Sequence, residues 1–146
     1  MLLDPRAPRF AAAVTTVVLA VALITGSVPV LAAQAVVFAV TAANPRFGPY
    51  GLLYRYLVAP RLAPPSEREP AAPVRFAQLV GLVFLLVALT GRLADLPVLA
   101  VAATGAALAA AFLNAAFDYC LGCQGYLLLR RLTGRPVPAR VPTGTS

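Results

Sequence analysis

The longest uncharged stretch of the chain limits its fold more than any other feature. It runs from Phe10 to Pro45 without a single acidic or basic residue. As one helix, at about 1.5 Å per residue, the stretch would be about 50 Å long, which exceeds the core of a bilayer. The segment "GSVP", Gly26 to Pro29, supplies a break because proline cannot continue a helix and glycine tolerates a turn. The stretch therefore predicts two short membrane spans.

Two further uncharged runs predict two further spans. Between them, "GRLADLP" forms a turn in which Asp95 is expected to cap a helix that has Pro97 in its first turn. The predicted fold is an all-α membrane protein whose four transmembrane helices form two hairpins, with two short cytoplasmic interfacial helices, one after each hairpin. The four spans are expected at residues 10–26, 29–43, 76–91 and 96–117.

Composition supports a membrane environment. Apolar residues make up 60% of the chain and charged residues 12%, against about 25% charged in an ordinary soluble domain. A chain of 146 residues cannot hide that much apolar surface in one core, so lipid must solvate part of it. The chain has no histidine, the commonest general base and metal ligand. The +7 charge comes from arginines at the ends of apolar runs, which excludes a nucleic-acid-binding face.

The arginines also predict an orientation. Eleven of the twelve fall on one side of the predicted spans, and Arg92 alone lies on the other. By the positive-inside rule, both termini and both cysteines face the cytoplasm of a multi-pass inner-membrane protein. A signal peptide cleaved near "AQA", residues 33–35, is the alternative, but its apolar run is longer than the usual 7–15 residues or so.

The chain contains an internal repeat. "APRFA" from Ala7 resembles "APVRFAQ" from Ala72, and "NPRFGPYGLLYRYL" from Asn44 resembles "DYCLGCQGYLLLRRL" from Asp118. This arrangement predicts two hairpins in the same orientation, each followed by a surface segment. Parallel repeats of this kind occur in other membrane bundles.

Each surface segment is expected to begin a new helix, because Asn44 and Asp118 are both good N-caps. The first of these helices would lie in the headgroup layer or pack on the bundle, and both alternatives fit its apolar stripe. Residues 60–73, with five prolines, predict an extended linker, and residues 134–146 a disordered tail after a membrane domain of residues 1–133. The stripe consists of Tyr50, Leu53, Tyr54 and Leu57.

The only two cysteines, Cys120 and Cys123, are the main candidates for chemistry. A C-x-x-C pair permits disulfide cycling, persulfide transfer or half of a metal site, and a zinc site would need a second copy of the chain. If Asp118 caps a helix, amide dipoles in its first turn favour a thiolate, whereas a span running straight through would disfavour it. The repeat places Arg46 opposite Cys120, where its charge would favour the thiolate further. Cysteines that only pack are the alternative.

Other polar residues in the spans have two interpretations. Asn114, inside the fourth span, is a functional candidate or a helix-to-helix hydrogen-bonding group, and Gln34 and Gln78 share this ambiguity. The small residues on the fourth span predict a surface for close helix packing. They include Ala102, Ala106 and Ala110.

The motifs "DPRAPRF", "NPRFGPYGLLYRYLVAPRL", "RFAQLVGLVF" and "CLGCQGY" resemble those of the domain of unknown function 4395 family, small integral membrane proteins of high-GC bacteria. The resemblance covers nearly all of residues 4–132. Members are often encoded beside thioredoxin-like proteins and rhodanese-type sulfurtransferases. The resemblance therefore implies a role in cytoplasmic thiol or sulfur traffic, with Cys120 and Cys123 as the residues involved.

These inferences predict a membrane-anchored dithiol partner of a thioredoxin-like or rhodanese-type protein. Cys120 would be the nucleophile and Cys123 the resolving thiol, supported by Asp118, Arg46 and Asn114. We expect no independent enzyme, no cofactor and no metal site. The alternative is a structural or channel-like component whose cysteines only pack. Partners are the lipid bilayer, such a soluble protein and, as a further alternative, a second copy of the chain in a homo-oligomer.

Overall fold

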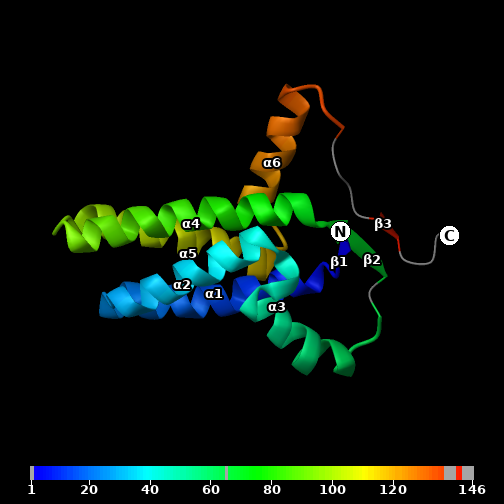
Figure 1. Ribbon diagram of the computed structural model, residues 1–146, viewed down its shortest axis with the longest axis horizontal. Helices are drawn as coiled ribbons and strands as arrows, with labels where there is room; N and C mark the ends of the chain where they lie inside the picture. The colour runs from blue at the N-terminus through cyan, green and yellow to red at the C-terminus, as the bar shows by residue number, and fades with distance from the viewer. Residues whose placement is uncertain (1, 65, 137–140, 143–146) are drawn as a thin grey trace.

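Four long helices lie side by side and form the body of the protein (Figure 1). The computed structural model describes residues 2–64, 66–136 and 141–142. Three helices are long and apolar enough to cross a membrane, whereas α2 is apolar but only 16 residues long. The prediction of an all-α, membrane-type fold is confirmed, and a fourth span in α2 stays a prediction. The four helices are α1 (Arg6–Thr25), α2 (Val28–Ala43), α4 (Ala71–Leu93) and α5 (Pro97–Phe117).

The turn between α1 and α2 has the chemistry that "GSVP" predicts. Gly26 adopts a left-handed conformation with φ of 66°, and its N–H donates to the carbonyl oxygen of Ala22 at 2.8 Å. Ser27 then caps α2, because its Oγ accepts the N–H of Val30 at 3.3 Å. Pro29 lies in the first turn of α2, where its missing N–H costs no hydrogen bond. The predicted helix break is confirmed.

The turn between α4 and α5 corrects a prediction. Asp95 does not cap α5: it adopts a φ of 59°, and Leu96 occupies the N-cap position without a capping side chain. The turn is closed instead by the N–H of Leu96, which donates to the carbonyl oxygen of Gly91 at 2.7 Å. A Cβ atom on Gly91 would lie 2.8 Å from the nitrogen of Ala100, so this close approach requires glycine.

Leucines and alanines fill the core of the bundle, where α1 packs mainly against α5 and α2 against α4. Leu19, Leu31 and Leu85 are almost completely buried there. Large apolar side chains also cover the outside of the bundle: Ile24 is 85% exposed and Val98 is 82% exposed. An outer surface of this kind is compatible with contact with lipid.

Gln34 has a structural role in this core. Its buried side chain on α2 donates to Oγ1 of Thr15 on α1 at 3.5 Å, and its Oε1 accepts the Tyr50 hydroxyl at 2.6 Å. The amide thus has protein partners on both sides, as a buried polar group requires. These hydrogen bonds connect α1, α2 and α3 (Pro49–Leu53).

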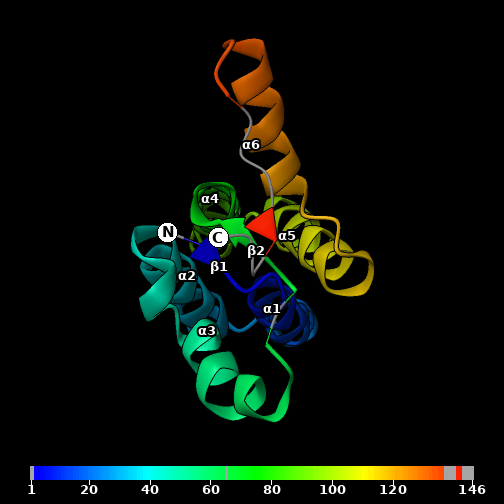
Figure 2. The ribbon, with the colours of Figure 1, turned by 90° about the vertical axis from the view of Figure 1, so that its right-hand side faces the viewer.

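Two short helices leave the bundle at the same end and point in opposite directions (Figures 1 and 2). They are α3 and α6 (Leu121–Leu132), and both are steeply inclined to the long helices. The N-terminus lies at this end too, together with a small antiparallel sheet in the order β1-β2-β3. The sequence did not predict this sheet. Its strands are β1 (Leu2–Leu3), β2 (Glu67–Pro70) and β3 (Val141–Pro142).

Two strands of this sheet lie in segments that were predicted to be a linker and a tail. Strand β2 lies in the linker predicted at 60–73, and α4 already begins at Ala71. In the tail predicted at 134–146, Val141 pairs with Arg68 of β2. Residues 137–140 and 143–146 of that tail lie outside the described residues.

The first surface segment, residues 44–61, is helical but irregular. Asn44 caps it as predicted, since its Oδ1 accepts the N–H of Arg46 at 3.0 Å. The predicted single apolar stripe is wrong: Tyr54 is 4% exposed, whereas Leu53 and Leu57 are exposed. From Tyr54 onward the segment is a π-helix, whose wider winding changes the angular spacing of the side chains that follow. In chain order, the segment consists of η1, a 3-10 helix (Pro45–Phe47), then α3, then η2, a π-helix (Tyr54–Val58), and finally η3, a 3-10 helix (Ala59–Arg61).

The two halves of the chain repeat an arginine contact. Arg9 near the start of α1 donates from Nη2 to the carbonyl oxygen of Ala115, near the end of α5, at 3.1 Å. Arg75 near the start of α4 donates from Nε to the carbonyl oxygen of Ala42, near the end of α2, at 2.8 Å. Each arginine thus joins the first helix of its own half to the second helix of the other half.

An aromatic contact repeats in the same way. Phe10 packs on Tyr54 with ring centroids 5.8 Å apart, and Phe76 packs on Tyr126 with centroids 5.6 Å apart. The rings are inclined by 49° in both contacts. In each half, an Arg-Phe pair on the first helix therefore contacts both the other half and its own surface segment, which supports the predicted repeat.

Candidate functional site

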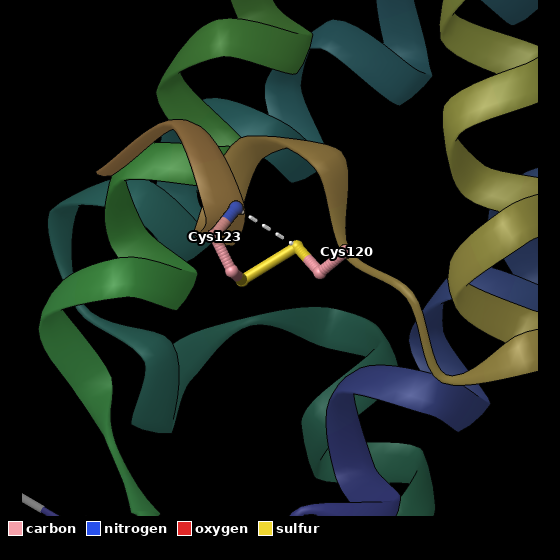
Figure 3. Close-up of a disulfide and its surroundings, with 2 residues drawn as sticks. All are labelled: Cys120 and Cys123. Carbon is pink, nitrogen blue, oxygen red and sulfur yellow. Dashed lines mark hydrogen bonds between the residues drawn. A yellow bond between two sulfur atoms is a disulfide. The ribbon is translucent and has the colours of Figure 1, made fainter. Parts of the chain in front are cut away.

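The two cysteines lie where α5 gives way to α6, and they form a disulfide (Figure 3). Helix α5 ends at Phe117, and Asp118 turns the chain with a φ of 53°. The backbone is extended at Cys120, and α6 begins at the next residue. The Cα atoms of Cys120 and Cys123 are 5.1 Å apart, so the disulfide closes the first turn of α6.

The helix cap at this site differs from the prediction. Asp118 was expected to cap the second surface helix, but it ends α5 and Cys120 is the N-cap of α6. Its Sγ accepts the N–H of Cys123 at 3.2 Å, drawn as a dashed line in Figure 3. The left-handed turn at Asp118 is the reason, because it stops α5 and delays the new helix. A fourth span running straight through the cysteines is also wrong.

Both cysteines nevertheless lie at the N-terminal end of a helix. The N–H groups of a first helical turn have no partners within the helix, and their dipoles favour negative charge. One such N–H, that of Cys123, already points at Cys120 Sγ.

Helix α6 is held to the bundle by its first turns. A Cβ atom on Gly122 would lie 2.6 Å from the backbone of Ala77 on α4, so glycine allows α6 to cross α4 closely. One turn further, Tyr126 packs on Phe76, and no residue of α6 is buried. At the far end of the helix, Leu132 is 76% exposed. The first turns of α6, which contain the disulfide, thus pack on α4, whereas its C-terminal end is apolar and exposed.

A cavity of about 410 Å³ lies directly beside the disulfide. Cys120 and the first turn of α6 form one wall, and α1, α2, α4 and α5 supply the others. Its lining is mostly apolar and partly aromatic, and none of the described residues that line it is charged. Polar groups come from Asn114 on α5 and Gln78 on α4, whose side-chain amides have no hydrogen-bond partner among the residues that the structure describes.

The structure brings together only some of the predicted site residues. Cys120 and Asn114 line the same cavity. Asp118 lies in the preceding turn, with Oδ1 4.0 Å from Nε of Arg9. Arg46 lines a different cavity, so the predicted support of Cys120 by its charge is not seen. Residues at equivalent positions of a repeat occupy equivalent places in the two halves, which need not be in contact.

Sequence reasoning missed the cavity. It predicted a packing surface along α5, whereas Ala106 and Ala110 line the cavity together with Phe76 and Gly81 of α4. The alanine-rich face of α5 opposite a glycine on α4 was the available signal.

The second cavity, about 490 Å³ in volume, is cationic. Its lining includes Asp4, which accepts Nη2 of Arg6 at 3.0 Å and the Tyr54 hydroxyl at 2.9 Å. Burial raises the pKa of Asp4, but the hydrogen bonds from Arg6 and Tyr54 together lower it by more than burial raises it. The pKa of Asp4 therefore lies below its usual value. Burial and the hydrogen bond to Asp4 both raise the pKa of Tyr54. The cationic lining residues are Arg6, Arg46, Arg55 and Arg68.

The described part of the chain brings together no group of three or more metal-ligating side chains. The fold and the site define a helical protein of membrane type: three of its helices are long and apolar enough to cross a membrane, and a C-x-x-C disulfide lies at one end of its bundle. A family model described as "Domain of unknown function (DUF4395)" matches residues 3–131, so the chain belongs to this family. Comparisons with curated proteins and with solved structures found no match.

Proposed function

We propose that the protein is a membrane-anchored thiol–disulfide partner of a thioredoxin-like or rhodanese-type protein. Its four long helices would span the inner membrane as two hairpins, with both termini and α3 and α6 at the cytoplasmic surface. The observation that carries the proposal is the Cys120–Cys123 disulfide in the first turn of α6. Both cysteines are half-buried at an end of the bundle, where a soluble partner has access to them.

The position of the disulfide favours chemistry over mechanical stabilisation. A loop this short gives about 2 kcal/mol in the chain-entropy model, less than the ~3 kcal/mol of a 15-residue loop. In the cytoplasm, moreover, disulfides of mesophilic proteins are usually transient and catalytic. In the exchange reaction Cys120 would attack or be attacked by the partner's sulfur, and Cys123 would resolve the mixed disulfide.

The first experiment is maleimide labelling in intact cells and in inside-out vesicles, before and after reduction. We expect both thiols to label only after reduction and only in inside-out vesicles. Labelling of intact cells would contradict the proposed orientation. Thiols that label only after denaturation would mean that the cysteines are inaccessible, which would overturn the exchange role.

The second experiment traps the partner. With Cys123→Ser, Cys120 should form a stable mixed disulfide with a thioredoxin-fold protein that lacks its own resolving cysteine. The matched control is Cys120→Ser, which leaves Cys123 as the only thiol and should give several-fold less mixed disulfide. Equal trapping by both variants, or by neither, would contradict the assigned roles.

The alternative is a structural component whose cysteines only pack or brace α6. The half-burial of both residues favours it. Double Cys→Ala and double Cys→Ser variants distinguish the two functions, because exchange chemistry is lost in both variants. A packing role is impaired chiefly by serine, since its hydroxyl is costly to bury.

A further inference from the structure

The cavity beside the disulfide has the features of a binding site for a small apolar molecule. Its volume of about 410 Å³ falls in the usual range for ligand pockets. Three aromatic rings line it, from Phe38 on α2 and from Phe76 and Phe84 on α4. Apolar walls with a few polar groups are typical of such sites.

Two amide side chains of the cavity are available for hydrogen bonds to a ligand. The amides of Asn114 and Gln78 line it from α5 and α4 and have no partner within the described chain. Each NH₂ group can donate to a carbonyl oxygen. The cavity therefore favours a ligand with carbonyl groups on an apolar body.

The absence of charge among the lining residues narrows the ligand class further. Redox cofactors that carry phosphates, such as nicotinamide or flavin nucleotides, need cationic or amide-rich anion sites. This cavity has no charged lining residue, and the arginines line the other cavity instead. An uncharged, membrane-soluble ligand fits these walls better.

A groove provides room for an apolar tail. Phe84 on α4 and Ala106 on α5 line the cavity and are both solvent-exposed. A third cavity, of about 290 Å³, continues along the same two helices and shares Phe84. Its lining is entirely apolar apart from the backbone. A ring in the first cavity could therefore extend its tail into the groove towards lipid.

We infer that this cavity binds a membrane-dissolved para-quinone with an apolar tail, which exchanges two electrons with Cys120 and Cys123. The inference rests on the proposed thiol–disulfide function and supplies its oxidant. Three observations meet here: a disulfide on the cavity wall, two amides that have no partner among the described residues, and a second apolar cavity beside the first.

The reaction balances with these participants. After a partner reduces the pair, the Cys120 thiolate adds to a ring carbon of the quinone, and one carbonyl oxygen takes up a proton. The Cys123 thiolate then attacks Cys120 Sγ, so the S–S bond forms while the S–C bond breaks. The electron pair of the broken bond passes to the ring, whose second oxygen takes the second proton. Two thiols lose two protons and two electrons, and one quinone becomes one quinol.

The test is anaerobic reoxidation of the full-length reduced protein in lipid nanodiscs. The probe is a fully substituted benzoquinone with a ten-carbon tail, whose ring forms no stable thiol adduct. Thiol titration and loss of quinone absorbance are followed together. We expect one disulfide per quinone consumed, at a rate that saturates with quinone concentration.

Variants show whether the cavity is responsible. Ala110→Phe fills the cavity, whereas Ala109→Phe on the exposed neighbouring position is the matched control. We expect Ala110→Phe to slow reoxidation about tenfold or more and Ala109→Phe to leave it unchanged. Asn114→Leu, which keeps the cavity open, should weaken quinone binding about fivefold through one lost hydrogen bond. Quinone binding with and without Asn114→Leu is measured in the double Cys→Ala protein, where no thiol reacts. This measurement does not use Ala110→Phe, so a folding defect of that variant does not decide the result.

The outcomes separate the two proposals. Mixed-disulfide trapping without cavity-dependent reoxidation overturns the quinone inference and leaves the partner function standing. Cavity-dependent reoxidation without trapping supports the quinone site and overturns the partner function. Equal reoxidation of wild type, Ala110→Phe and a free dithiol peptide would mean a bulk reaction and would also overturn the quinone inference.

Discussion

The two surface segments of the molecule, residues 44–61 and 118–132, begin alike and end differently. Each starts with a side-chain cap, from Asn44 in the first and from Cys120 in the second. Each then brings a glycine close to a long helix, Gly48 to α2 and Gly122 to α4. Both segments then leave the bundle, in opposite directions (Figure 2). Tyr54 of the first is nevertheless buried, whereas no residue of α6 is buried.

The difference lies in what each segment does with its polar groups. In the first, the hydroxyls of Tyr50 and Tyr54 donate to Gln34 and Asp4, so the segment is anchored at two points. In the second, no residue of α6 is buried, and the polar features are the disulfide and the capping sulfur of Cys120. One copy of the repeat is anchored by tyrosine hydrogen bonds, and the other has its first turn closed by the disulfide.

The largest test of this comparison uses the two glycines. Gly122→Ala would place a Cβ atom 2.6 Å from the backbone of Ala77, which cannot move aside, and should lower the free energy of unfolding by about 1–3 kcal/mol. Gly48→Ala meets the Thr41 side chain at the same distance and should cost less, because that side chain can rotate. Thermal unfolding in detergent measures both.

The control for the glycine pair is Gly125→Ala in the same helix. The nearest atom to its Cβ would be 4.0 Å away, so the change should raise the free energy of unfolding by about 0.5–1 kcal/mol through helix propensity. If Gly122→Ala behaved like Gly125→Ala, the close seat of α6 on α4 would not exist in solution.

The second test concerns the tyrosines that pack on the repeated phenylalanines. Tyr54→Phe removes a hydroxyl that donates to Asp4 and should lower the free energy of unfolding by about 1–2 kcal/mol. The matched change, Tyr126→Phe, keeps the ring contact and removes a hydroxyl without a hydrogen bond in the described chain. It should leave the melting temperature unchanged, and equal losses would mean that both tyrosines act only through their rings.

Much of this fold could be predicted from the sequence because it follows from local rules. Uncharged runs, the "GSVP" break and the Asn44 cap each depend on a few neighbouring residues. The true roles of Asp95 and Asp118 could not be predicted in this way. Both residues adopt left-handed conformations in turns between helices and do not cap the helix that follows. The apolar stripe failed at Tyr54 for a similar reason, since π-helical winding has no sequence signature here.

The cysteine pair could be singled out from the sequence, but its surroundings could not. The spacing of Cys120 and Cys123 left disulfide cycling, persulfide transfer, half a metal site or simple packing open, and the structure has a disulfide there. The repeat suggested the new helix near them. The cavity requires four long helices and α6 to meet, and no local pattern encodes such an arrangement. Asn114 was noted only as a polar residue in a span, and its neighbours gave it a place beside Cys120.

A smaller test uses pH to loosen the first segment alone. The pKa of Asp4 lies below its ordinary value of 3.8, so the folded state holds the carboxylate in preference to the acid. Its stabilising contribution is therefore complete above pH 3.8 and is lost as the pH falls below it. We expect Asp4→Asn to have a lower melting temperature at neutral pH and a flatter acid limb. Parallel acid limbs for the two proteins would contradict this origin of the pH dependence.

The smallest expected effect distinguishes the two repeated arginines. Both donate to a carbonyl oxygen of the other half, but Arg9 also lies 4.0 Å from Asp118, in the turn that precedes the disulfide. Both partners of this ion pair are more than a third exposed, so solvent and salt screen it, and Arg9→Gln should cost at most about 0.2–1 kcal/mol more than Arg75→Gln. High salt should remove the difference, because the carbonyl hydrogen bonds are much less sensitive to ionic strength than an ion pair. A difference that persists in high salt would instead assign it to the geometry of the α5–α6 turn.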